Sequence, residues 1–216
     1  LYEKKLCTYP RTDSRYLTDD MLPRVKEILL WASGICNLPI TDELYGEQLC
    51  NSKKVTDHHA IIPTKAASWQ DLEALPMGEQ NILKLISRQV MIATSGPYCY
   101  KEADAMISCG GADFKLHLKM PQDFGWKRYT AEKKGGKWFS GLATGQALTP
   151  DTVTVKDGKT QPPKPFTEDT LLSSMERAGV EDMPEDAERK GLGTPATRAG
   201  ILEKLVSTGL VERVKK

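Results

Sequence analysis

The sequence predicts a fold of the α+β class, with a helical first part, an antiparallel β-rich middle and a helical last part. Residues 79–94 carry apolar side chains at the spacing of an amphipathic helix. Residues 113–120 alternate strictly between apolar and polar side chains, which is typical of a half-buried strand. Prolines cluster at 162–165, and two short helix patterns follow them. These observations divide the chain into three predicted domains, at 1–97, 98–165 and 166–216.

The first part is predicted to open with a short strand at 7–16 that runs into an irregular loop, because Pro10 cannot donate a hydrogen bond to a ladder. Thr18 is a candidate N-cap for a helix that stops at Gly34. Residues 36–68 show little periodicity and are predicted to be loops around short elements.

Two more strands are predicted in the middle part, at 102–108 and 151–156. In the last part, helices are predicted at 168–178 and at 195–208, the second with Thr194 as its cap. The expected turns of the β-rich part are Gly110-Gly111, Gly135-Gly136 and Asp157-Gly158.

The composition is that of an ordinary globular protein, with 39% apolar and 27% charged residues. No run of 18 apolar residues is present, so the sequence predicts no membrane-spanning helix. The five cysteines form no C-x-x-C pair, which argues against a zinc site or a disulfide framework and favours reduced thiols in a cytoplasmic protein. The chain does not begin with Met, and we expect it to be a piece of a longer protein.

Charge is segregated along the chain, although the formal net charge is only +1. Residues 126–164 carry eight Lys or Arg against three Asp or Glu, residues 167–188 carry one against eight, and residues 189–216 carry seven against two. An acidic connector thus separates two basic stretches. Charge alone fits solvated surface as well as it fits a surface that binds phosphates.

The first candidate motif is the loop TYPRTDSRY, which holds two phenols, two guanidinium groups, three Ser or Thr hydroxyls and a carboxylate. Tyr9 is a candidate nucleophile, but a phenol is a weak nucleophile at neutral pH and needs cationic help. Arg11 is the nearest candidate for that help, because a guanidinium can bind two phosphate oxygens at once. An ordinary surface loop remains an alternative.

The second candidate motif is DHHAIIPT. A histidine near a phosphate can donate a hydrogen bond or carry a proton, which makes His58 and His59 candidates. Adjacent histidines point in different directions in most backbones, so both are not expected to bind one metal. A polar loop that leads into an apolar stretch is the alternative.

The third candidate motif is KGLGTPATR, in which glycines lead directly into a capped helix. Free amides and the helix dipole at such a position suit a phosphate. The motif is no Walker loop, because the ending Gly-Lys-Ser/Thr is missing. An ordinary helix start is the alternative.

Taken together and in this order, the segments TYPRTDSRYL, DHHAIIPT and GLGTPATRAGILEKL resemble the type IA DNA topoisomerases, and most closely their topoisomerase III branch. The segment PPKPFTEDTLLSSMERAG also looks like that family's approach to the last motif. The resemblance covers roughly residues 6–212.

This resemblance implies an isomerase that cleaves and reseals one DNA strand through a transient 5′-phosphotyrosine link at Tyr9, without ATP. Arg11 would position the scissile phosphate and His58 would act beside it. The residues implied to shape the site are Asp13, Ser14 and His59. The residues implied in DNA binding are Thr197, Arg198, Gly191, Gly193 and Thr194.

The resemblance also implies an architecture: a CAP-like or winged-helix-like domain that bears the tyrosine, a β-rich gate or hinge segment, and a helical DNA-binding segment. Magnesium is expected for the full-length enzyme, bound by a Toprim domain outside this chain, and no metal is expected in this chain. The expected partner is single-stranded DNA, with no membrane, and the expected location is the cytoplasm at the nucleoid. The 216 residues alone are expected to be an internal, inactive fragment.

Three other functions stay open at this point. A non-catalytic module that binds single-stranded nucleic acid, such as a winged-helix regulator, would use the 195–208 helix and the basic stretch at 126–138. A tyrosine recombinase also forms phosphotyrosine, but its tyrosine comes late, after dispersed Arg and His residues. A purely structural fragment is the third. A covalent protein–DNA adduct would separate the topoisomerase from the binding module.

Overall fold

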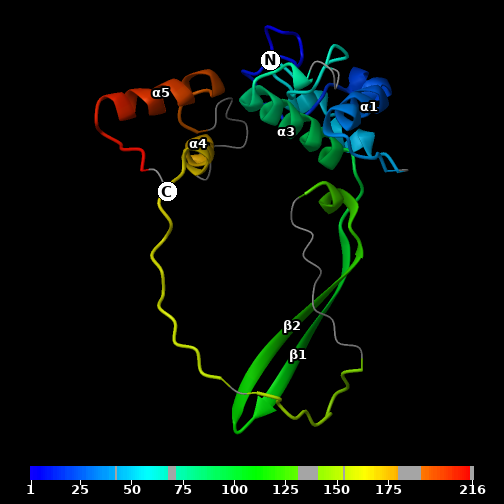
Figure 1. Cartoon of the computed structure of the whole chain (residues 1–216), viewed down its shortest axis with the longest axis vertical. Helices are drawn as coiled ribbons and strands as arrows, with labels where there is room; N and C mark the ends of the chain where they lie inside the picture. The colour runs from blue at the N-terminus through cyan, green and yellow to red at the C-terminus, as the bar shows by residue number, and fades with distance from the viewer. Residues whose placement is uncertain (42, 68–71, 131–140, 153, 180–190, 215–216) are drawn as a thin grey trace. The chain divides into compact units, whose positions relative to one another are not determined.

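The computed structural model of the chain describes residues 1–216 except 42, 68–71, 131–140, 153, 180–190 and 215–216 (Figure 1). The chain forms two compact units, Leu1–Gln146 and Ala147–Lys216. The described residues combine α-helices with one two-stranded antiparallel sheet, so the mixed helix-and-strand class is confirmed. No described helix has both the length and the apolar character that crossing a bilayer requires.

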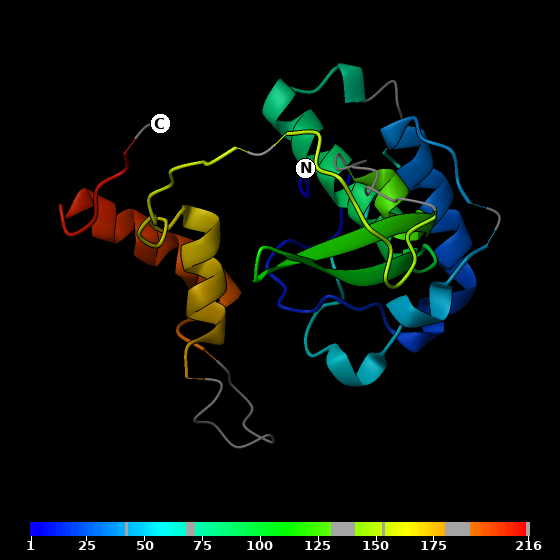
Figure 2. The same cartoon turned by 90° about the horizontal axis from the view of Figure 1, so that it is seen from below.

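The first unit is built around two packed helices, α1 (Val25–Cys36) and α3 (Met77–Ala93) (Figures 1 and 2). Two short 3₁₀ turns, Gly46–Leu49 and Ser52–Lys54, lie in the predicted loop region. The predicted apolar face of α3 is confirmed in part, because Leu83, Val90 and Met91 are buried whereas Ile82 and Leu85 are exposed. The buried core residues of this helical body include Leu17, Ile28, Leu29, Ala32, Val90 and Met91.

The start and the end of α1 differ from the prediction. Thr18 makes no side-chain capping bond, and a 3₁₀ turn at Asp19–Arg24, which contains Pro23, comes before the helix. The helix continues past Gly34 because the left-handed residue that ends it is Asn37, with φ of 50°. The predicted strand at 7–16 is reduced to an isolated bridge between Cys7 and Pro63.

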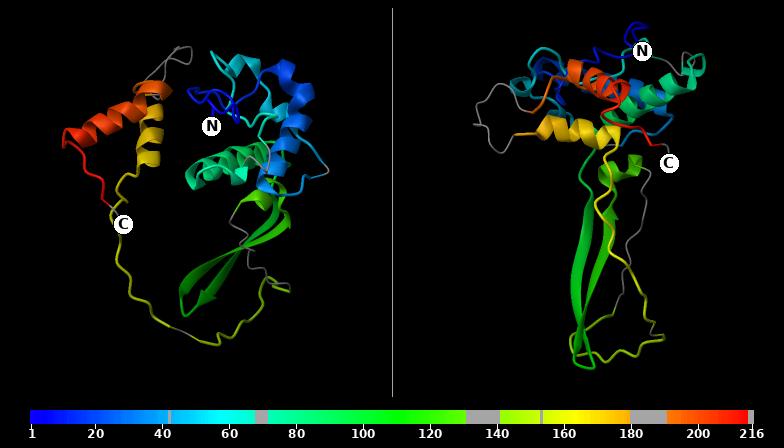
Figure 3. Two further views of the ribbon diagram at one scale, coloured as in Figure 1. Left: turned by 45° about the horizontal axis from the view of Figure 1, so that its top comes forward. Right: turned by 90° about the vertical axis from the view of Figure 1, so that its left-hand side faces the viewer.

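The middle of the chain forms a long hairpin, β1 (Cys99–Cys109) and β2 (Ala112–Asp123), which projects from the helical body of its unit (Figure 3). The turn at Gly110 and Gly111 is confirmed, and both glycines have positive φ. Leu118 is buried, whereas Phe114, on the same face, is 57% exposed. The apolar face is therefore covered near the body and bare toward the tip.

The predicted strand at 151–156 is wrong for its described residues, which form no strand. Val155 there is 92% exposed. A β-branched pattern forms a strand only where another strand offers a partner, and this segment pairs with none of the described strands. The predicted turn at Gly135-Gly136 and most of the acidic stretch, at 180–188, lie outside the described residues.

A 3₁₀ turn, η4 (Gly125–Tyr129), joins the hairpin to the helical body. The Trp126 amide donates to the carbonyl of Gly96 at 2.9 Å, and the Tyr129 hydroxyl donates to the carbonyl of Pro39 at 2.8 Å. Gly125 has φ of 43°, and a Cβ there would overlap the Pro97 carbonyl. The base of the hairpin is therefore fixed against the end of α3.

The second unit contains α4 (Glu168–Arg177) and α5 (Pro195–Ser207), which are drawn in gold and orange-red in Figure 2. Both agree with the predicted helices within one residue. At each start, two threonines bond to one another three residues apart, Thr167 with Thr170 and Thr194 with Thr197. Arg213 then pairs with Glu203 on α5 and Glu168 on α4, and these bonds raise the pKa of its guanidinium.

Candidate functional site

The loop that carries Tyr9 runs antiparallel to the segment that carries His58. The Thr8 amide donates to the carbonyl of Ile62 at 3.0 Å, and the Thr64 amide donates to the carbonyl of Leu6 at 3.1 Å. The Thr8 hydroxyl accepts a bond from the Ile62 amide at 3.0 Å. Two motifs that lie about fifty residues apart in the sequence are thus held side by side by backbone bonds.

The Tyr9 ring contacts two other rings. The ring centroids of Tyr9 and His58 are 4.5 Å apart, at an interplanar angle of 50°. Tyr2 also meets Tyr9 edge-on, with the ring centroids 5.2 Å apart. Tyr2 reaches this position because the chain reverses at Lys5, whose φ is 59° and whose amide donates to the Tyr2 carbonyl. Tyr9 is half-buried by these contacts.

Arg11 and Asp13 are both exposed. The Arg11 guanidinium has no hydrogen bond or ion pair with any residue that the structure describes. Among the described residues, the only bond that the Asp13 carboxylate accepts is a long one, 3.5 Å, from the hydroxyl of Thr56. The guanidinium is therefore available to an anion from outside, two residues along the chain from the phenol.

Ser14 and Thr12 bond to the backbone around the loop. The Ser14 hydroxyl lies 2.9 Å from the Lys54 carbonyl, and it accepts a bond from the Tyr16 amide at 3.1 Å. The Thr12 hydroxyl donates to the His58 carbonyl at 2.8 Å. These hydroxyls bind the loop at two places, so they hold the relative positions of Tyr9 and His58.

His59 lines a small cavity of about 210 Å³ with Thr8 and Trp31. Its Nδ1 lies 2.7 Å from the carbonyl of Ala60. The structure therefore brings His58, and not His59, onto the phenol.

The neighbouring thiol is a poor alternative nucleophile. Cys7 is buried, and this burial raises the pKa of its thiol, so the thiolate is disfavoured. All five cysteines are free. Within the described ranges, no three His, Cys, Asp or Glu side chains come together in a way that could hold a metal ion. The donor set needed for magnesium is therefore not assembled among these residues.

The second unit places the glycine-rich loop between α4 and α5. The Leu192 amide donates to the Met175 carbonyl at 2.7 Å, and Gly191, with φ of 89°, lies so close that a Cβ would overlap the carbonyls of Met175 and Glu176. Gly193 also has positive φ, at 67°. The glycines are thus needed where the loop passes the end of α4.

Thr197 and Arg198 are both engaged within this loop. The Thr197 hydroxyl accepts a bond from the Thr194 amide at 2.9 Å. Arg198 donates through Nε to the Leu192 carbonyl at 3.0 Å and through Nη2 to the Gly193 carbonyl at 3.3 Å. The third motif is therefore a tightly bonded turn, and Lys190 before it lies outside the described residues.

Sequence reasoning missed three residues that the structure places in the Tyr9 site: Tyr2, Thr8 and Thr12. The two threonines stand inside the motif and could have been considered as loop anchors. Tyr2 had no signal, because its position depends on a left-handed Lys5 that no sequence pattern indicates.

Comparison with known proteins agrees with the resemblance. The family described as DNA topoisomerase matches residues 1–216. A protein named DNA topoisomerase 3 from Bacillus licheniformis is 35% identical over 100% of this chain and 32% of its own length. Proteins of the same name from Bacillus subtilis and Haemophilus influenzae are each 34% identical over 99% of this chain, covering 32% and 35% of their lengths. The chain thus spans about a third of the curated relatives it matches.

Proposed function

This chain belongs to the DNA topoisomerase family, in the type IA topoisomerase III branch, and we propose that Tyr9 is the nucleophile with which the longer protein cleaves one DNA strand. The observation that carries the proposal is the packing of the Tyr9 ring on the His58 ring, with the ring centroids 4.5 Å apart. Backbone hydrogen bonds hold the two motifs that carry these rings side by side. Resealing would then allow relaxation or decatenation without ATP.

The proposed step is a reversible transesterification. The Tyr9 oxygen attacks a backbone phosphorus, a phosphorus–oxygen bond forms to the phenol, and the bond to the 3′ oxygen breaks. The phenol proton leaves and the 3′ oxygen takes up a proton, so a free 3′ hydroxyl and a 5′-phosphotyrosine result. The reverse attack by the hydroxyl reseals the strand, because the ester preserves the energy of the bond that was cut.

Arg11 and His58 have separate roles in this proposal. Arg11 binds the non-bridging oxygens of the scissile phosphate. This role is supported by the guanidinium, which is exposed and forms no ion pair with a described residue. His58 packs on the Tyr9 ring, and its proposed role is to donate a hydrogen bond to the reacting group or to carry a proton. Asp13, Ser14 and His59 shape the loop around them.

We further propose functional domains at 1–97, 98–165 and 166–216: a CAP-like or winged-helix-like domain that bears the tyrosine, a gate or hinge segment, and a DNA-binding segment. The hairpin that projects from the helical body suits the second role. The loop at 191–198 suits contact with the phosphates of single-stranded DNA, at the N-terminus of α5. Magnesium would be bound by another part of the longer protein, which would act in the cytoplasm at the nucleoid.

The test is covalent capture of DNA by the longer protein that carries this chain. Tyr9→Phe keeps the ring but removes the attacking oxygen, so we expect no denaturant-resistant complex with a single-stranded oligonucleotide and nearly unchanged DNA binding. Tyr2→Phe is the matched control, since Tyr2 touches the same ring but has no chemical role here. A normal yield of covalent complex from Tyr9→Phe would refute the assignment. Absence of an adduct from the unsubstituted protein would favour the non-catalytic binding module.

A further inference from the structure

A row of aromatic rings and lysines lies at the base of the hairpin, near the two ends of β1 and β2 that join the helical body. We define this aromatic–lysine patch by the residues Tyr98, Tyr100, Phe124, Trp126, Lys119 and Lys127. None of them belongs to the Tyr9 loop or to the loop at 191–198. Tyr100, Phe124 and Trp126 keep 41%, 38% and 37% of their surface exposed, which is much for large rings.

Rings and ammonium groups alternate within the patch. Lys119 Nζ lies 3.3 Å from the centroid of Tyr100 and 5.6 Å from that of Tyr98. Lys127 Nζ lies 4.1 Å from the centroid of Tyr98 and 5.7 Å from that of Trp126. Tyr98 also contacts Tyr100, with centroids 5.2 Å apart. The row therefore reads ring, cation, ring, cation, ring.

The nearby carboxylates are occupied by other groups. Asp123 accepts bonds from Arg128 and from the Gly125 amide. Glu102, which faces Lys119 across the hairpin, bonds to His117 at 2.9 Å. Across the part of the chain that the structure describes, no carboxylate forms an ion pair with Lys119 or Lys127. The two ammonium groups thus rest on rings and leave their charge available to an anion.

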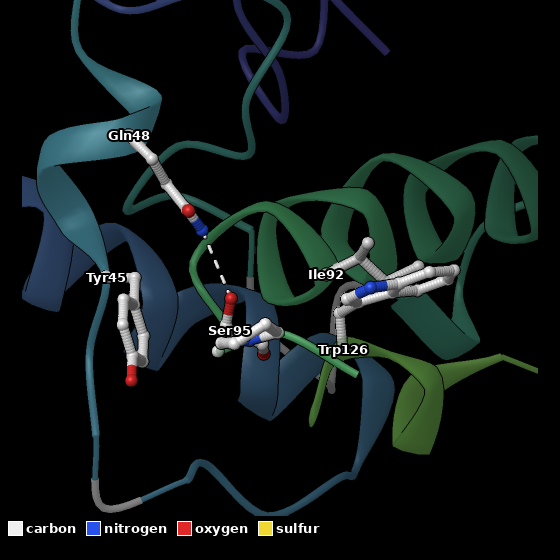
Figure 4. Close-up of a pocket in the computed structure, with 7 residues that line it drawn as sticks. Tyr45, Gln48, Ile92, Ser95 and Trp126 are labelled. Carbon is white, nitrogen blue, oxygen red and sulfur yellow. Dashed lines mark hydrogen bonds between the residues drawn. The ribbon is translucent and has the colours of Figure 1, made fainter. Parts of the chain in front are cut away.

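Trp126 also walls an adjacent open cavity of about 490 Å³, together with Tyr45, Ile92 and Ser95 (Figure 4). In this view Tyr45 and Trp126 lie on opposite sides of Ser95, and Gln48 reaches Ser95 from above. The Gln48 amide donates to the Ser95 carbonyl at 3.1 Å, which fixes one wall. A cavity with two aromatic walls next to the row can accept a planar, uncharged group such as a nucleobase.

We propose that the aromatic–lysine patch is a second binding site for single-stranded DNA, separate from the site of cleavage. The 3.3 Å between Lys119 Nζ and the Tyr100 ring is close to the roughly 3.4 Å that separates stacked bases. A base and the ammonium therefore compete for one ring face. A phosphate draws the flexible lysine away, the ring face becomes free, and an unpaired base stacks on it.

The proposal rests on the proposed function only in taking DNA as the ligand. A DNA duplex would not bind the patch in this way, because its bases are stacked on one another and cannot stack on the aromatic rings. A single strand supplies both phosphates for the two lysines and free base faces for Tyr100 and Trp126. Such a site would hold a strand at the base of the hairpin while Tyr9 acts on another phosphate.

The test measures the affinity of the longer protein, in the Tyr9→Phe background that prevents cleavage, for a fluorescent single-stranded oligothymidine of about 12 nucleotides. Tyr100→Leu and Trp126→Leu should each weaken binding by roughly 5-fold to 100-fold, the loss that corresponds to one base stack. Tyr100→Phe keeps the ring and should bind normally. Phe114→Leu, an exposed ring on the same hairpin but outside the patch, is the matched control.

Replacement of the two lysines should change the salt dependence of DNA affinity, which replacement of the rings should not. Lys119→Gln and Lys127→Gln should each reduce the slope of log affinity against log salt by about 0.7, the value for one phosphate contact to a single strand. Lys101→Gln is the control. Consecutive strand residues point to opposite faces, so the side chain of Lys101 lies on the face of the hairpin opposite to that of Tyr100. The leucine variants should leave this slope unchanged.

Crosslinking locates the strand directly. With photoreactive thymidines in the same oligonucleotide, crosslinked peptides should include 98–100 and 124–127. The proposal would be overturned if Tyr100→Leu and Trp126→Leu bind the oligonucleotide with unchanged affinity, or if crosslinks are confined to the Tyr9 loop and to 191–198. Either result would favour a protein as the partner of the patch. Neither result would affect covalent capture by the protein with Tyr9 intact, so this failure is distinguishable from failure of the proposed function.

Discussion

The rings of Tyr9 and His58 are in contact, with centroids 4.5 Å apart, although 48 residues separate them in the chain. The contact does not depend on the two rings alone. The Thr12 hydroxyl donates to the His58 carbonyl, and the Thr8 amide donates to the carbonyl of Ile62, four residues beyond His58. Backbone bonds on both sides of the pair therefore fix the histidine relative to the phenol before any substrate arrives, which is what a reaction that depends on orientation requires.

Replacement of His58 should slow cleavage without preventing it. His58→Ala removes the imidazole that contacts the Tyr9 ring but leaves Tyr9, so we expect covalent capture at a rate reduced by about 100-fold or more, as for loss of an acid–base group. Single-turnover capture of an oligonucleotide measures this rate. His117→Gln, a histidine on the hairpin outside the site, is the control and should capture DNA at the normal rate. Equal rates for His58→Ala and the unsubstituted protein would remove His58 from the mechanism.

Arg198 should affect DNA binding through the loop that it holds. Arg198→Ala loses a charge and both bonds, to the carbonyls of Leu192 and Gly193, so single-strand affinity should fall alike for all base sequences. Arg198→Lys keeps the charge but cannot form the same fork. If loop geometry dominates, Arg198→Lys binds as poorly as Arg198→Ala. Full rescue by lysine would show instead that the charge alone matters. Fluorescence anisotropy with several oligonucleotide sequences separates these results.

Gly191 should be the most sensitive glycine of the second unit. Gly191→Ala introduces a Cβ at φ of 89° against the carbonyls that end α4, so we expect a loss of about 1–3 kcal/mol in the unfolding free energy of that unit. Gly200→Ala is the matched control: it lies in α5 with open space around it, and alanine there should stabilise by about 0.5–1 kcal/mol. Hydrogen exchange of the α5 amides measures both. Equal protection in the two variants would contradict the packing described for the loop.

The sequence predicted the elements whose signals are local. The helix at α3, the β1–β2 hairpin with its Gly110-Gly111 turn, and the threonine-capped helices α4 and α5 all follow from periodicity, alternation and capping within one short segment. The strand at 151–156 was wrong because strand formation needs a partner, and the local pattern of that segment does not reveal whether one exists.

The candidate site was predictable in its members but not in its geometry. The amino-acid sequences of the motifs identified Tyr9, Arg11 and His58 as candidates. The hydrogen bonds of Thr8 and Thr12 that join the two motifs are long-range contacts, and no sequence pattern predicts them. The expected phosphate-binding role of Thr197 and Arg198 took no account of their bonds within the loop. The aromatic–lysine patch was also missed, because it depends on the contact of Tyr98, just before β1, with Lys127 in the 3₁₀ turn η4, more than 20 residues away in the sequence.

The face of the hairpin that carries His117 should show an acid-dependent contact. A hydrogen bond from His117, and a second from Lys115, lower the pKa of the Asp104 carboxyl. Because the folded-state pKa is depressed, the ionised carboxylate stabilises the hairpin above its usual pKa, and this contribution is lost as the pH falls through the lowered value. Carbon NMR of the Asp104 carboxyl between pH 2 and 6 should give a midpoint below the usual one.

His117→Gln provides the check on that cause. Glutamine lacks the imidazole Nδ1 that lies 2.7 Å from the Asp104 carboxylate, so the Asp104 midpoint should move up toward its ordinary range, while Phe114→Leu, on the other face, should not move it. A midpoint that stays low in His117→Gln would assign the shift to Lys115 alone.

The last prediction concerns the 216 residues by themselves, which should neither relax supercoiled DNA nor cleave it efficiently, even with magnesium. A phenol is protonated at neutral pH and needs help to become a nucleophile. Here Tyr9 is half-buried against two rings, Arg11 faces solvent, and the described residues assemble no set of three metal ligands. Catalytic groups that act together lose most of their rate enhancement when one of them is missing. A site that faces solvent also lacks the water-excluded surroundings that strengthen interactions between charges. Incubation with negatively supercoiled plasmid and magnesium, followed by gel separation of topoisomers, tests this. Relaxation at catalytic ratios of protein to DNA that disappears in Tyr9→Phe would show that the groups on this chain suffice, and that magnesium held elsewhere is not needed for the chemistry.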